Sequence, residues 1–229
     1  MGLTSPQERA HILLAMARRH AYKGDGSQSQ SPTWTRPVAD LRDLLPTPFA
    51  ITGGVATRLY MPERLTEDLD LVVPQGAALA CERALHAAHA HLLGPHPAGG
   101  TRWWLPAAFP TDVPSTDSRW DILELLAFDG PAPTNERQAL DLIALATPWL
   151  PEALATATSG PTGLPVLTLP YLSLMKLTTA RLGDVADLCR MLRLAAQPVT
   201  QAVTRVVQDY APEALPLLSD IIATVRMAA

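Results

Sequence analysis

The sequence predicts an α/β protein whose second half is mainly helical. Between residues 49 and 127, short apolar runs bounded by Gly, Pro and Asp alternate with helical patterns, which is typical of strands joined by helices. From residue 170 onward, apolar residues recur at helical spacing and prolines separate the segments. We therefore expect two parts, residues 1–134 and residues 135–229.

Composition limits the possible functions. The chain has 229 residues, of which 48% are hydrophobic and 17% charged, so it can bury a core. Its formal net charge of -4 argues against a broad nucleic-acid surface, so any such contact would be local. The two cysteines, Cys81 and Cys189, lie in apolar helical patterns, which favours reduced thiols in a cytoplasmic protein. We expect no signal peptide and no membrane span.

The first elements are a helix and a linker. Ser5 and Glu8 have the spacing of a capping box, and the helix that they begin would run to Tyr22. Residues 23–37 are rich in Gly, Ser and Gln and predict a flexible linker. Residues 38–45 then predict a short amphipathic helix.

The chain is organised around residues 51–73, which predict a strand, a turn, a helix, a loop and a second strand. Residues 49–52 form the first strand. Gly53 and Gly54 allow backbone angles and a closeness of approach that a Cβ would forbid. A helix over residues 55–60 would direct its free N–H groups at this turn, and that arrangement favours a phosphate.

Two acids, Asp68 and Asp70, begin the second strand. Residues two apart on a strand share a face, so these carboxylates lie roughly 7 Å apart at Cα. They repel each other unless a positive group lies between them, and oxygen ligands without Cys or His suit a hard cation such as Mg²⁺. The alternative is structural: the glycines form only a turn, and the acids are only a polar strand start.

A helix is expected over residues 75–93, with His86 and His89 one turn apart and His91 and His96 nearby. This spacing could hold a transition metal. Because we find no Asp, Glu or Cys that completes the ligand set, a solvated helix face is the preferred interpretation.

Two further strands are expected at residues 101–105 and 119–127. The tandem tryptophans of the first could stack on a base, although core packing is favoured. Asp121 lies among apolar neighbours in the second, which is costly unless it is paired or ligates a cation. Glu124 points to the opposite face and is the weaker candidate.

The later residues predict helices and one short strand. Residues 135–146 are expected to be helical, residues 154–163 a loop and residues 166–169 a strand. Proline opens a helix over residues 170–181, in which Lys176 is polar. The remaining helices are expected at residues 185–195, 199–210 and 213–227.

Four polar residues flank a break expected at Gly183: Lys176, Arg181, Asp184 and Asp187. Taken alone, they suit a structural interpretation in which Asp184 is an N-cap and Lys176 lies on a solvated face. Their spacing is K-L-x-x-x-R-x-x-D-x-x-D-L, a pattern that is compared below with a known family.

The central stretch combines glycines, a basic residue, a hydroxyl residue and two acids: Gly53, Gly54, Arg64, Thr66, Asp68 and Asp70. This order resembles the first motif of polymerase-β-type nucleotidyltransferases. It is most similar to the AbiEii-like branch, with its GG-x-A and R-x-[ST]-x-D-[LI]-D pattern, which includes toxins of bacterial toxin–antitoxin systems. The Lys-Arg-Asp-Asp spacing resembles that branch's second motif. The resemblance implies a small mixed β-sheet core with helices on one side, followed by a helical lobe that completes the active site.

The resemblance also implies roles for these residues. Asp68, Asp70 and a third acid from a neighbouring strand, matched here by Asp121, would hold one or two Mg²⁺. Lys176 would contact nucleotide phosphates, and Asp184 or Asp187 would orient Lys176, Arg181 or the acceptor. The remaining residues implied in nucleotide binding are Thr52, Gly53, Gly54, Thr57, Arg64, Thr66 and Arg181. One departure is that Gly54 replaces the serine of the classical Gly-Ser turn.

The implied reaction is transfer of a nucleoside monophosphate from a nucleoside triphosphate, such as ATP, to a tRNA 3' end or a protein, with release of pyrophosphate. An antitoxin protein is the implied partner. Two alternatives stay open: a nucleotidyltransferase that modifies a small molecule such as an antibiotic, and a non-catalytic binding protein of the same fold. The acidic charge mildly favours a small-molecule or a protein acceptor over tRNA.

Overall fold

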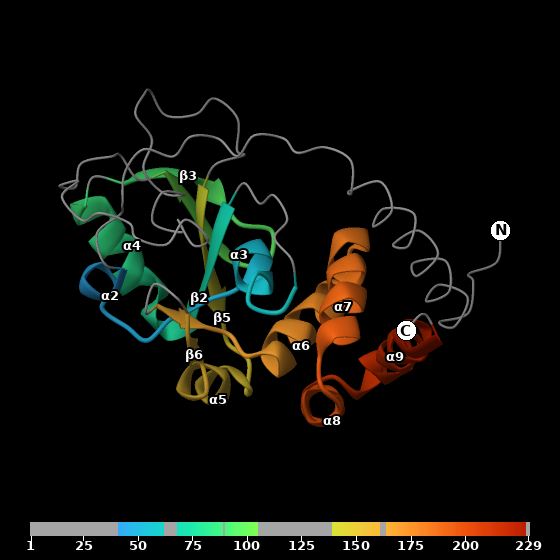
Figure 1. Ribbon diagram of the computed structural model, residues 1–229. Coiled ribbons are helices and arrows are strands. Elements are labelled where there is room, and N and C mark those ends of the chain that lie inside the picture. Colours follow the sequence, from blue (N-terminus) through green and yellow to red (C-terminus); the bar gives the residue numbers. More distant parts are fainter. Residues whose placement is uncertain (1–40, 62–67, 89, 105–138, 161–163, 228–229) are drawn as a thin grey trace, which may run out of the picture. The chain divides into compact units, whose positions relative to one another are not determined.

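The computed structural model describes residues 41–61, 68–88, 90–104, 139–160 and 164–227 (Figure 1). The chain forms two compact units. The described residues of the first, here the sheet unit, are 41–58 and 68–167 with the gaps given above. Those of the second, the helical unit, are 59–61 and 168–227. The helix and linker expected before residue 38 and the strand expected over residues 119–127 lie outside the described residues.

The sheet unit contains a seven-stranded mixed sheet with the order β3-β4-β5-β2-β1-β7-β6. The central pair β2 and β5 is parallel, as is β1 with β7, and the other neighbours are antiparallel. This sheet and its helices confirm the expected α/β class. The strands are β1 (Ala50–Ile51), β2 (Asp68–Pro74), β3 (His91–Pro95), β4 (Gly100–Trp104), β5 (Ala139–Leu145), β6 (Thr158–Ser159) and β7 (Pro165–Val166).

Helices accompany the sheet and make up the helical unit. Those of the sheet unit are α2 (Leu41–Leu44), α3 (Gly53–Thr57), the 3-10 turn η1 (Gln75–Ala77), α4 (Ala78–Ala87) and α5 (Leu150–Ala155). Those of the helical unit are α6 (Leu169–Thr179), α7 (Leu182–Leu194), α8 (Gln197–Tyr210), the 3-10 turn η3 (Pro212–Ala214) and α9 (Leu215–Met227). Among the described residues, no helix combines the length and apolarity that crossing a bilayer requires.

Two helix predictions were wrong. The helix expected over residues 75–93 ends at Ala87, and β3 begins at His91 because Gly94 and Pro95 oppose helix continuation. Of the helix expected over residues 135–146, the described residues 139–145 form the strand β5. Its apolar residues pack on both sides of a central strand, and such a continuous apolar run cannot be distinguished from a buried helix by periodicity alone.

The two faces of the central strands differ in polarity. Leu69 and Leu71 of β2 and Leu140 and Leu142 of β5 are almost fully buried, and each contributes roughly 1.5–3 kcal/mol by burial. Since β4 places Trp103 on this same face, α4 covers it: the His86 ring meets the Trp103 ring edge to face at 4.7 Å. The acidic residues project from the opposite face by strand alternation.

The hairpin of β3 and β4 is held closely against β5. His96 and Gly99 close its turn, because the Gly99 N–H donates to the His96 carbonyl at 3.0 Å. Gly99 and Gly100 have φ values of 95° and 98°, which favour glycine. A Cβ on Gly100 would overlap the Leu142 carbonyl, so glycine permits the close approach of β4 to β5.

The helical unit has its own core. Helix α6 packs against α7 and α8, and α7 packs against α9. The break between α6 and α7 falls at Ala180, whose φ is 47°, and Gly183 lies inside α7. The break expected at Gly183 was therefore misplaced by a few residues, because a left-handed residue, Ala180, ends α6.

Candidate functional site

Strands β2 and β5 bring three carboxylates to one face of the sheet. Asp68 and Asp70 are half-buried and share a face of β2, as their spacing predicted. Strand β5 runs parallel to β2 with Asp141 in register with Asp70. Neighbouring residues in register point to the same side of a sheet, so Asp141 joins the acidic face. It is 1% exposed.

The turn after β1 packs against one of these carboxylates. The Thr52 N–H donates to the Asp70 carbonyl at 2.8 Å, which joins the turn to β2. Gly53 has a φ of 60°, and a Cβ added there would overlap the Asp70 carboxylate. Glycine is therefore required at this position both for its backbone angle and for the space that Asp70 occupies. The expected closeness of the glycine turn and the acids is found.

The buried carboxylate of Asp141 has two partners from the β3–β4 hairpin. Arg102 Nε donates to one oxygen, Oδ1, at 2.9 Å. His96 Nε2 lies 3.3 Å from the other, Oδ2, and the His96 side chain is 9% exposed. A buried ionised carboxylate is costly unless paired, so Arg102 offsets the cost of burying Asp141.

The ligand atoms of Asp70, His96 and Asp141 lie within 4.8 Å of one another. Oxygens bound to one Mg²⁺ lie about 3–4 Å apart, because each Mg–O distance is about 2.1 Å. Carboxylates on adjacent strands therefore fit a hard divalent cation after a small adjustment, with Asp68 on the same face. A transition metal could also use the imidazole if its Nε2 carried a lone pair.

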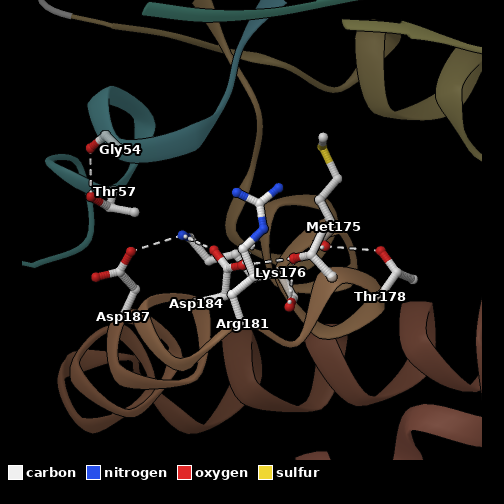
Figure 2. Close-up of polar contacts among 9 residues, drawn as sticks. Gly54, Thr57, Met175, Lys176, Thr178, Arg181, Asp184 and Asp187 are labelled. Carbon is white, nitrogen blue, oxygen red and sulfur yellow. Dashed lines mark hydrogen bonds and ion pairs between the residues drawn. The ribbon is translucent and has the colours of Figure 1, made fainter. Parts of the chain in front are cut away.

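Some of the residues expected to hold phosphates belong to the turn and to α3, which packs against β2. Helix α3 begins at Gly53, two residues before the expected start, and a helix of five residues has only a weak dipole to attract an anion. The Thr57 side chain is buried, and its hydroxyl donates to the Gly54 carbonyl at 2.6 Å (Figure 2). Thr52 is also buried. The phosphate roles of these residues stay predictions.

A second charged cluster lies wholly within the helical unit. Lys176 of α6 is 5% exposed, and its ammonium donates to Asp187 at 2.8 Å and to Asp184 at 3.1 Å, both on α7 (Figure 2). Asp184 also accepts a hydrogen bond from the Thr179 hydroxyl at 2.7 Å. Arg181 is largely exposed, with Nε 4.0 Å from Asp184. Lys176 and Asp187 of the second motif are thus buried together, with Asp184 half-buried beside them and Arg181 exposed. Asp184 lies in the first turn of α7 and is not its N-cap, because Arg181 takes that position.

Three predicted site residues, Arg64, Thr66 and Asp121, lie outside the described residues. Sequence reasoning missed Asp141, because its segment was taken as a helix. A signal was present: the Leu-Asp-Leu of β5 repeats the Leu-Asp-Leu of β2. His96 was considered only beside the other histidines, and Arg102 was not considered at all.

Trp103 and the two cysteines are buried or packed in the structure and have no sign of a chemical role. Trp103 is 1% exposed, which confirms the core interpretation over base stacking. Cys81 is fully buried in α4, and burial raises the pKa of its thiol to about 11, so it is neutral near pH 7 and not an activated nucleophile. Cys189 lies in α7 of the helical unit and, within the described residues, forms no disulfide with Cys81.

Comparison with known proteins gives little guidance. No family model matches the chain, and no curated protein matches it. Among solved structures, the chain is similar to the antibiotic-resistance factor ANT(2'')-Ia, whose solution structure it matches at 11% identity over 98% of this chain and 94% of that chain, with a TM-score of 0.37. A TM-score this low establishes neither a common fold nor a common function.

Proposed function

We propose that this chain is a Mg²⁺-dependent nucleotidyltransferase that transfers a nucleoside monophosphate from a nucleoside triphosphate to a tRNA 3' end or a protein, as the toxin of a bacterial toxin–antitoxin system. The observation that carries the enzymatic part is the meeting of Asp68, Asp70 and Asp141 on one sheet face beside Gly53. The toxin assignment rests on the AbiEii-like pattern of the first motif. Asp141 replaces Asp121 as our candidate for the third acid, because it is in register with Asp70.

The proposal gives separate tasks to the acids, to Gly53 and to Lys176. Asp68 and Asp70 present oxygens at the start of a rigid buried strand, where one or two cations could bind. The chemistry that Mg²⁺ supplies when bound is neutralisation of the triphosphate charge and activation of the attacking hydroxyl. Gly53 leaves room for Asp70 and lets backbone approach the phosphates closely. Lys176 keeps its proposed contact with the nucleotide, in competition with its two carboxylate partners.

Label transfer tests the proposal. The protein is incubated with α-labelled nucleoside triphosphates and Mg²⁺, in separate reactions with total tRNA, cell protein or aminoglycosides. Asp70→Asn should lower transfer about 10²-fold or more, because it removes a ligand of the cation that would neutralise transition-state charge. Asp209→Asn on the exposed surface of α8 is the matched control and should transfer at the wild-type rate.

The acceptor identifies the class of enzyme. Label on tRNA or protein supports the proposal, and a growth defect on expression that Asp70→Ala relieves supports the toxin role. Label on an aminoglycoside instead supports the small-molecule alternative. The net charge of -4 mildly favours a small-molecule or a protein acceptor, because tRNA is strongly anionic. Nucleotide binding without any transfer would leave only the non-catalytic alternative. The antitoxin partner and cytoplasmic location stay predictions.

A further inference from the structure

His96 lies where a cation shared by Asp70 and Asp141 would be expected. Its Nε2 is 3.3 Å from Asp141 Oδ2 and belongs to the same 4.8 Å cluster as an Asp70 oxygen. Two opposite roles are compatible with this position. The imidazole could be a ligand that strengthens cation binding, or it could be a hydrogen-bond donor that occupies Asp141 and weakens cation binding.

The other ring nitrogen of His96 decides between these roles. The Ala98 N–H donates to His96 Nδ1 at 3.2 Å. Nδ1 must therefore carry the lone pair, and the proton of the neutral ring lies on Nε2. A metal-binding histidine has the reverse arrangement, in which the nitrogen away from the metal donates its proton to an acceptor. His96 thus presents an N–H, and not a lone pair, to Asp141.

Both oxygens of Asp141 then face N–H groups. Arg102 donates to Oδ1 and His96 donates to Oδ2. Arg102 comes from β4 in register with Asp141, whereas His96 comes from the hairpin turn. A divalent cation that bridges Asp70 and Asp141 would meet the His96 proton, which it repels. Asp141 Oδ1, which accepts from Arg102, is the other oxygen of the carboxylate and keeps its partner.

We infer that His96 competes with the divalent cation: its N–H holds Asp141 in the cation-free protein, and a cation that binds Asp70 and Asp141 displaces the imidazole from Asp141. The inference rests on the proposed cation site, but not on nucleotide transfer. His96 is accordingly a positioning residue that sets how strongly the cation binds.

Direct cation binding tests this role. Mn²⁺ is the probe, since it also prefers oxygen ligands and its free concentration can be followed by electron paramagnetic resonance. Without nucleotide, His96→Ala should bind Mn²⁺ about three- to tenfold more tightly than wild type, the worth of one hydrogen bond. Asp70→Asn should bind more weakly. His91→Ala, an exposed histidine of β3, is the matched control and should bind as wild type does.

The opposite sign would overturn the inference. Weaker binding by His96→Ala would make His96 a ligand, unchanged binding would make it a bystander, and absence of Mn²⁺ binding in wild type would remove the cation site. Failure of label transfer with intact Mn²⁺ competition would instead count against the proposed function alone.

Nitrogen-15 NMR of the His96 ring in the wild-type protein is a second test. Because it needs no substitution, misfolding of a variant cannot affect its result. Without cation, the His96 ring should show the tautomer with its proton on Nε2. Addition of Mg²⁺, which unlike Mn²⁺ is diamagnetic, to saturation should shift the His96 resonances. A proton on Nδ1 in the cation-free protein, or a ring spectrum indifferent to saturating Mg²⁺, would contradict the competition.

Discussion

Single atoms set the geometry of the acidic face. The absence of a Cβ on Gly53 leaves the space in which the Asp70 carboxylate lies, and the in-register position of Asp141 brings a second carboxylate beside it. A change of one methyl group at Gly53 therefore acts directly on Asp70. The contacts of Asp141 with Arg102 and His96 hold the other carboxylate in place.

Gly53→Ala should disable the acidic face while the sheet stays folded. The left-handed backbone costs alanine roughly 1–2 kcal/mol, and the new methyl group must push the Asp70 side chain aside. We expect Mn²⁺ affinity to fall at least as far as in Asp70→Asn, with a circular dichroism spectrum like that of wild type.

Gly76→Ala is the matched control for this change. A Cβ on Gly76 would meet no atom within 4 Å, and its φ is not left-handed. Its Mn²⁺ affinity should equal that of wild type. Wild-type affinity in Gly53→Ala would show that Asp70 does not need its present position.

At the scale of elements, one buried lysine joins two helices. Lys176 of α6 is nearly inaccessible and is neutralised by Asp184 and Asp187 of α7. Buried charges that lose a partner are strongly destabilising, whereas replacement of both partners by apolar residues often is not. The cluster therefore contributes to the stability of the helical unit, whether or not Lys176 also contacts a nucleotide.

Lys176→Met should lower the free energy of unfolding by about 3–5 kcal/mol, because it leaves the Asp187 carboxylate, almost wholly buried, without its ammonium. The double variant Lys176→Met with Asp187→Leu should recover most of that loss. Urea denaturation followed by far-ultraviolet circular dichroism measures both.

Arg181→Met is the control at this cluster. The Arg181 side chain is 64% exposed, and the change should alter stability by no more than about 0.5 kcal/mol. Equal stabilities for Lys176→Met and Arg181→Met would show that the buried cluster contributes nothing.

At the scale of the whole molecule, the chain builds two cores. The sheet unit buries the leucines of β2 and β5 with Trp103, and the helical unit packs four helices, α6 to α9. The described residues of the helical unit contain no tryptophan, so tryptophan fluorescence reports on the sheet unit. Circular dichroism at the helix minimum reports largely on α6 to α9.

Substitutions in the two units should therefore shift different signals. Gly100→Ala strains a left-handed residue and overlaps the Leu142 carbonyl, so it should destabilise the sheet unit by on the order of 2–5 kcal/mol. Its fluorescence midpoint in urea should fall further than its circular dichroism midpoint. Lys176→Met should show the reverse order. Equal shifts of both signals in both variants would mean that the two units unfold as one.

The sequence by itself determined the features that depend on neighbouring residues. Alternation fixed Asp68 and Asp70 on one face of a strand, and the glycine pair marked the turn beside them. Proline and the apolar spacing after residue 170 located α6 to α9 within a few residues. Each of these depends on backbone geometry over a few positions, which local residue types control.

Only the tertiary structure decided which distant residues complete the acidic face. Asp141 reaches Asp70 because β5 pairs in parallel with β2, about seventy positions apart in the chain, and a parallel register leaves no local signal. His96 reaches Asp141 because the β3–β4 hairpin folds against β5, where Gly100 permits a close approach. A one-residue shift in either pairing would turn Asp141 or Arg102 to the other face, so strand register, which local pattern does not fix, selects these residues.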